Sequence, residues 1–129
     1  MKKLICLFFV AMVALGAKAY DFEGRLKALY HDLPAEFGRG LSITEVTYDG
    51  ENVVYNYIID EGLIMFEAIE SQSGMFHDVF VAENISAKDP TVIEVRDACI
   101  AEGKGIKHHF AGSKSGKTFD VVLTHDELK

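Results

Sequence analysis

The chain has 129 residues with 13 basic and 20 acidic side chains, a formal net charge of −7 at pH 7. This length suits one compact domain around a single core and is too short for two ordinary domains. The acidic balance argues against nucleic acid as a partner, because contacts to phosphates require a basic face.

The first segment has the three parts of a secretory signal peptide. Residues 2–3 are lysines, residues 4–14 form an apolar run, and residues 17–19 read Ala-Lys-Ala, a small-x-small cleavage site. The apolar run is shorter than the roughly 20 residues that a spanning helix needs, so we expect no transmembrane segment. We predict a signal peptide over 1–19 and a single α+β domain over 20–129. The destination would be the periplasm or the exterior of a Gram-negative bacterium.

Cleavage would remove three lysines and none of the acidic residues, so the net charge would fall from −7 to −10. An acidic surface keeps an exported protein in solution, and it also offers a docking face to a basic partner. Cys6 would leave with the leader, so Cys99 would stand alone and no intramolecular disulfide could form. We expect Cys99 to be a buried core residue and the protein to be a monomer or weak dimer.

Two stretches are predicted to be helical. Residues 22–33 place apolar side chains at helical spacing, with Asp21 as the N-cap and Pro34 as the stop. Asp89 followed by Pro90 opens a second helix, which the glycines at 103 and 105 would close. Between the two, residues 62–82 predict two short helices or one broken helix, with residues 79–81 extended as an alternative.

The stretch AGSKSGKT, residues 111–118, fits the pattern of a phosphate-binding loop. A working loop of that kind is followed by a helix, whose free N–H groups meet the phosphates. Here residues 119–124 alternate apolar and polar side chains and include β-branched ones, which is typical of a strand. We therefore predict a β-turn at Ser115-Gly116 and no nucleotide site.

Residues 39–63 and 104–128 can be laid over one another. Each begins with a basic residue, a glycine and an aliphatic residue, passes a turn glycine, and reaches Asp-Glu ten residues after that glycine. This repeat predicts a duplicated helix-strand-strand unit, with halves at about 21–63 and 89–128. The fold expected from it is a four-stranded antiparallel sheet with helices packed on one face.

The first hairpin carries the candidate binding residues Tyr48, Tyr55 and Tyr57. If Asp49-Gly50 forms the turn, these three share one face with other apolar residues, and the opposite face is also apolar, with Leu41, Ile43, Val54 and Ile58. A sheet covered by helices on one side would leave part of this surface exposed, as contact surfaces require. The alternative is that the tyrosine rings pack beneath the middle segment with their hydroxyls in water.

His108 and His125 are the candidate metal ligands. In a hairpin that turns at Ser115-Gly116 they share a face about one cross-strand pair apart, whereas the adjacent residues His108 and His109 point to opposite sides. Two histidines need further ligands for a zinc or copper site, and the spacing supplies none. The carboxylates at 60–61 and 126–127 stand where strands end, and we interpret them as capping residues.

The export signal and the paired hairpins resemble the small exported α/β proteins of unknown function of Gram-negative bacteria, the Bacteroides group included. This resemblance implies no catalytic residues. In fold, tandem helix-plus-sheet repeats are also similar to those of secreted β-lactamase inhibitor proteins. We predict a non-catalytic periplasmic or secreted module, without a cofactor, that binds a protein or envelope partner. The alternative is a small metal-dependent or hydrolytic enzyme using His108, His125 and nearby carboxylates.

Overall fold

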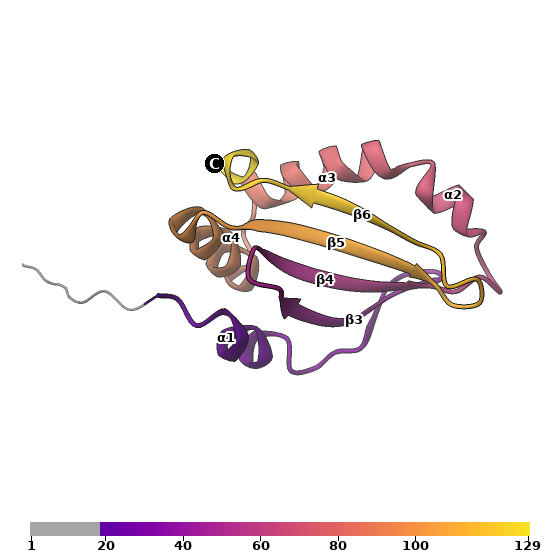
Figure 1. Cartoon of the computed structure of the whole chain (residues 1–129), viewed down its shortest axis with the longest axis horizontal. Coiled ribbons are helices and arrows are strands. Elements are labelled where there is room, and N and C mark those ends of the chain that lie inside the picture. Colours follow the sequence, from indigo (N-terminus) through magenta and orange to yellow (C-terminus); the bar gives the residue numbers. More distant parts are fainter. Residues whose placement is uncertain (1–18) are drawn as a thin grey trace, which may run out of the picture.

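The computed structural model describes residues 19–129, so the predicted signal peptide lies almost wholly outside the described residues. The chain forms one mixed sheet with helices around it (Figure 1). In chain order the elements are α1 (Phe22–Leu29), β2 (Ala35–Gly38), β3 (Leu41–Tyr48), β4 (Asn52–Ile59), α2 (Phe66–Glu70), α3 (Ser73–Ile85), α4 (Pro90–Glu102), β5 (Gly105–Gly112), β6 (Thr118–Leu123) and the 3₁₀ helix η1 (His125–Leu128). None of the helices in this part of the chain has the length and apolar character needed to cross a membrane.

The expected four-stranded antiparallel sheet is wrong. The sheet has five strands in the order β2-β3-β4-β5-β6, and its central pair, β4 and β5, is parallel, with Asn52 opposite Gly105 and Ile59 opposite Gly112. The reason is the long connection between them. Helices α2, α3 and α4 carry the chain back along the sheet, so β5 starts beside the beginning of β4, and parallel neighbours require a crossover of this kind.

The internal repeat is likewise not supported. Both hairpins exist, but the first half has an extra strand, β2, which pairs with β3 and which the sequence analysis did not predict. The two hairpins are joined side by side through the parallel pair instead of repeating one antiparallel unit. The aligned glycines mark two turns made by the same chemistry, since Gly50 and Gly116 both have positive φ, at 97° and 73°.

A β-bulge corrects the expected faces of the first hairpin. The register of β3 against β4 shifts between Ile43 and Glu45, so Leu41 pairs with Ile59 and Ile43 with Tyr57. Directly paired residues share a face, and the extra residue therefore moves Leu41 and Ile43 to the same side as the tyrosines. One face of the sheet becomes apolar, and the opposite face carries mostly polar side chains, including Thr47, Asn56, Lys107, His109 and Asp120.

The helix caps agree with their sequence signals. Asp21 caps α1 by accepting a hydrogen bond from the Gly24 N–H, and Asp89 caps α4 through the Thr91 N–H. Helix α4 ends at Gly103, which adopts the left-handed conformation. Helix α1 ends at Leu29, four residues earlier than predicted. The middle segment forms two helices, and residues 79–81 are helical instead of extended.

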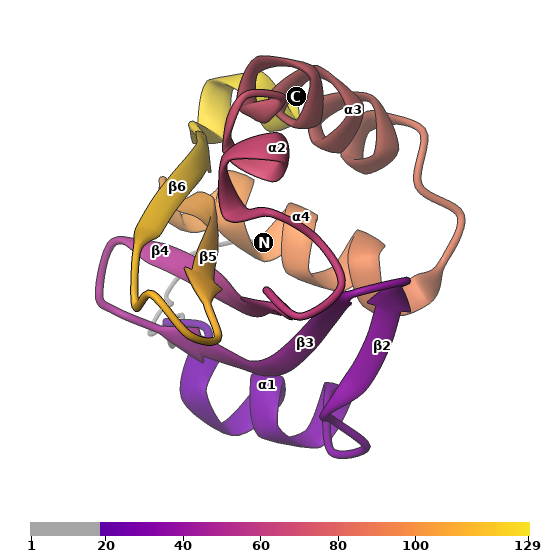
Figure 2. The same cartoon turned by 90° about the vertical axis from the view of Figure 1, so that its right-hand side faces the viewer.

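The core lies between the apolar face of the sheet and the helices. Phe22 of α1 stacks on Tyr48, Phe66 of α2 contacts Phe119, and Phe80 of α3 stacks on His108. The side chain of Cys99 on α4 is fully buried in the same cluster, as expected. In Figure 2, α4 lies between α3 at the top of the view and α1 at the bottom.

Candidate functional site

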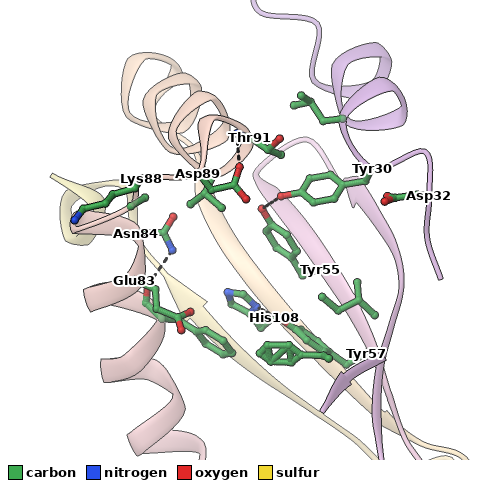
Figure 3. A pocket seen from close by; sticks show the side chains of 16 residues that line it. Tyr30, Asp32, Tyr55, Tyr57, Glu83, Asn84, Lys88, Asp89, Thr91 and His108 are labelled. Carbon is green, nitrogen blue, oxygen red and sulfur yellow. Dashed lines mark hydrogen bonds between the residues drawn. The ribbon is translucent and has the colours of Figure 1, made fainter. Parts of the chain in front are cut away.

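A cavity of about 580 Å³ opens where α1, β2, α3 and the start of α4 meet the sheet (Figure 3). Its volume lies within the roughly 300–1,000 Å³ of ligand pockets in proteins. Its lining side chains come from α1, β2, β3, β4, α3, α4, β5 and the loops that follow α1 and α3, and none of these parts could form the cavity alone. The lining is dominated by aromatic rings, namely Tyr30, Phe37, Tyr55, Tyr57, Phe80 and His108.

His108 of β5 is a buried polar residue of the cavity. Its side chain is only 5% exposed, and its ring lies between Phe80, with centroids 3.7 Å apart, and Tyr55, at 5.1 Å. The imidazole Nδ1 lies 2.7 Å from the Tyr57 hydroxyl, whereas Nε2 has no hydrogen-bond partner among the residues described. Burial lowers the pKa of His108 to about 3, because a charged imidazole would lose its hydration there. The ring is therefore neutral at physiological pH.

Two tyrosine hydroxyls close one side of the cavity. The hydroxyl of Tyr30, which follows α1, lies 2.7 Å from the hydroxyl of Tyr55 on β4. Burial raises the pKa of both phenols, so both stay protonated and each can donate one hydrogen bond. This pair connects the end of α1 to the centre of the sheet, as Figure 3 shows.

The rim of the cavity is acidic. Asp32 follows α1, Glu83 belongs to α3, Asp89 is the N-cap of α4, and Lys88 is the single cation among the lining residues. Asp32, Glu83 and Lys88 are exposed and take no part in ion pairs with other residues of 19–129. The mouth thus has three carboxylates around an aromatic interior.

The three candidate tyrosines do not lie together. Tyr55 and Tyr57 both line the cavity, Tyr55 partly buried and Tyr57 only 3% exposed in the core. Tyr48 stacks on Phe22 near the β3–β4 turn, and its hydroxyl donates to the Gly50 carbonyl. The hairpin therefore does not present a continuous tyrosine surface to solvent, because α1 and α3 pack against the face that carries these rings.

The candidate metal ligands are not brought together either. His108 stands opposite Val121 in the sheet, two residues from the register expected for a two-residue turn, whereas His125 lies beyond β6 in η1 beside Asp126. Within residues 19–129 there is no group of three or more His, Cys, Asp or Glu side chains that could hold a metal ion.

The phosphate-loop match lies on the β5–β6 turn, and a strand follows it, as predicted. Its exposed N–H groups already have an anionic partner from within the chain. Glu61, just after β4, accepts hydrogen bonds from the backbone N–H groups of Lys114 and Ser115, both at 2.7 Å. These bonds lower the pKa of the Glu61 carboxyl. Glu61 therefore has a structural role, holding the turn against the end of β4, and it does not cap a helix.

Most of the cavity was not predicted from the sequence. The missed residues on the rim and wall come from a loop, an unpredicted strand and a helix, and they include Asp32, Phe37, Phe80 and Glu83. The one usable signal was the aromatic pair Phe76 and Phe80, four residues apart, which indicates one buried helix face. Nothing local indicated that Phe37 would lie over Tyr57, with centroids 5.6 Å apart.

No protein-family model and no curated protein matches the chain. Its fold is similar to three solved structures. A candidate secreted protein from Pseudomonas aeruginosa is 11% identical, with 82% of this chain and 88% of that chain covered and a TM-score of 0.67. The type 2 secretion system pilotin EpsS from Vibrio vulnificus is 18% identical, with 83% and 87% covered and a TM-score of 0.51. The type II secretion system pilotin AspS from Vibrio cholerae is 19% identical, with 81% and 85% covered and a TM-score of 0.50. At these identities the likeness shows a shared fold.

Proposed function

We propose that the protein is a non-catalytic, exported interaction module that binds a segment of a cell-envelope protein in the aromatic cavity. The observation that carries this proposal is the cavity itself, which opens to solvent at Phe37 and reaches inward to His108. Aromatic side chains supply large contact areas at little entropic cost and are enriched in protein interfaces. Tyr55 and Tyr57 thereby keep the binding role predicted for them, whereas Tyr48 lies outside the cavity.

The chemistry of the cavity favours binding over catalysis. A general base works best when its pKa lies near the operating pH, and His108, with a pKa near 3, is a weak base. Its Nδ1 is already engaged by Tyr57, and the hydroxyls of Tyr30 and Tyr55 are engaged with each other. These groups can position a ligand by hydrogen bonds without transferring protons.

The similar structures support an envelope role. Two of the three are pilotins of type II secretion systems, and the third is a candidate secreted protein. The signal peptide predicted over 1–19 would carry this chain across the inner membrane. We infer a partner within the envelope, with the periplasm as the place where the two meet.

The proposal is tested by site-specific photocrosslinking in the bacterium that produces the protein. A photoreactive phenylalanine analogue at Ala87, on the cavity wall, should form an adduct with one envelope protein. The same analogue at Val122, on the opposite face of the sheet and 43% exposed, should not. Equal adducts from both positions, or none from Ala87, would contradict the proposal.

A matched pair of substitutions shows whether the adduct depends on the cavity. Phe37→Ser removes an apolar ring that is 48% exposed at the mouth, and Met75→Ser removes a side chain that is 53% exposed outside the cavity. We expect Phe37→Ser to lower partner affinity about tenfold, in the range of an interface anchor, and Met75→Ser to have little effect.

A further inference from the structure

The proposed function leaves the chemistry of the bound segment open, and the charges at the mouth bear on it. Asp32, Glu83 and Asp89 surround a cavity that contains one lysine, Lys88, so the mouth has an excess of two negative charges. Asp32 and Glu83 have no ion-pair partner within residues 19–129. Carboxylates around a cavity of low dielectric attract cations and repel anions.

The interior adds a second and independent observation. His108 is more than nine-tenths buried, lines the cavity, and has no partner at Nε2. Figure 3 shows its imidazole in the middle of the lining side chains. A buried polar atom without a partner costs free energy, so a ligand that satisfies it gains affinity.

The Tyr57 hydroxyl lets this imidazole act as an acceptor. A hydroxyl can donate to Nδ1 or accept from it, so the neutral ring can carry its single N–H hydrogen on either nitrogen. When Nδ1–H donates to Tyr57, Nε2 presents a lone pair to the cavity.

We propose that the cavity selects a partner segment in which an arginine or lysine side chain stands next to an apolar residue. The cationic head enters the cavity, where the carboxylates of Asp32 and Glu83 at the mouth balance its charge and His108 Nε2 accepts a hydrogen bond from one of its N–H groups. The apolar neighbour packs on Phe37 at the mouth. This inference rests on the proposed function and adds the chemical class of the partner segment.

The test uses two end-blocked peptides, acetyl-Leu-Arg-Leu-Phe-amide and acetyl-Leu-Gln-Leu-Phe-amide, which differ only in charge and in the head group. The exported form of the protein is purified with isotope labels. Each peptide is titrated into it, and binding is followed by NMR. We expect the arginine peptide to bind at least about fivefold more tightly, since the two exposed carboxylates of Asp32 and Glu83 attract its charge. The largest shifts should fall on the cavity residues and on the His108 ring nitrogens.

Charge variants at the mouth provide the control. Asp32→Asn with Glu83→Gln should weaken the arginine peptide about fivefold and leave the glutamine peptide unchanged. Glu102→Gln, the same charge change at an exposed position away from the cavity, should alter neither. All three positions are exposed, so these variants should fold like the native chain.

The possible failures are distinguishable. Equal affinity for the two peptides, shifts confined to the opposite face of the sheet, or no binding of the arginine peptide at millimolar concentration would each overturn the inference. The crosslink from Ala87 would still stand in those cases, and the proposed function with it. Loss of that crosslink would instead remove the proposed function, whatever the peptides do.

Discussion

At the scale of single residues, His108 stabilises the fold at neutral pH and makes its stability depend on pH. Its ring is stacked between Phe80 and Tyr55 and bonded to Tyr57, and burial lowers its pKa to about 3, compared with 6.5 for a free histidine. A depressed histidine pKa means that the unfolded chain takes up the proton first as pH falls. The contribution to stability is therefore complete above about pH 7 and is lost progressively between pH 6.5 and 3.

We predict that His108 makes the free energy of unfolding about 2 kcal/mol lower at pH 5 than at pH 7. Urea unfolding at both pH values measures this change. In His108→Gln the contribution of about 2 kcal/mol from this histidine should be absent. An NMR titration of the imidazole gives the answer independently of any variant. A resonance of His108 that titrates near pH 6.5 in the folded protein would contradict the buried, neutral ring.

At the scale of elements, the caps and turns account for where the chain changes direction. Asp89 is the clearest case, because its side chain accepts from the Thr91 N–H at 2.9 Å, directly before Pro90 at the first helical position. The carboxylate also stands at the rim of the cavity. The same residue thus holds the start of α4 and contributes charge to the mouth.

These two roles of Asp89 can be separated by substitution. Asp89→Ala should lower the free energy of unfolding by about 1 kcal/mol, since it removes the N-cap, whereas Asp89→Asn should cost only a few tenths because asparagine caps equally well. Thermal or urea unfolding of both variants checks this. Equal destabilisation by alanine and asparagine would show that the charge of Asp89, and not its hydrogen bond, supports α4.

At the scale of the whole molecule, the parallel pairing of β4 with β5 joins the two hairpins and creates the cavity. It places Tyr55 beside His108 and Tyr57 beside Phe110, so the aromatic rings of both hairpins form one surface beneath α3 and α4. An antiparallel pairing of the same strands would reverse the order of the β5 side chains along β4, and these neighbours would no longer meet. The cavity is therefore a property of the topology.

Engineered disulfides test this pairing directly. Ile58 lies opposite Ala111 on the polar face, so Ile58→Cys with Ala111→Cys should form a disulfide, because paired residues come within the Cα separation that a disulfide requires. Ile58→Cys with Lys107→Cys should not, since four residues along a strand separate the two by about 13 Å. Gel mobility with and without reductant measures both. The reverse result would indicate antiparallel strands.

The turns, the start of α4 and the strand after the phosphate-loop match each depend on a few neighbouring residues, so they could be predicted from the sequence. Asp49-Gly50 and Ser115-Gly116 predicted both turns, and Asp89 with Pro90 predicted the start of α4, because turn and cap conformations arise from backbone torsions and hydrogen bonds within four residues. The strand after the phosphate-loop match was predicted for the same reason. Local alternation of side chains sufficed.

Other features required the folded chain. The bulge between Ile43 and Glu45, the extra strand β2 and the parallel pairing of β4 with β5 all depend on which distant segment lies alongside, and the alternation within one strand contains no information about its neighbour. The cavity depends on these three features, because they bring its lining residues together. Tyr55 and Tyr57 were expected either on an exposed face or beneath the middle segment, and His108 was a candidate metal ligand. Contacts with helices far along the chain turn all three into the wall of one cavity.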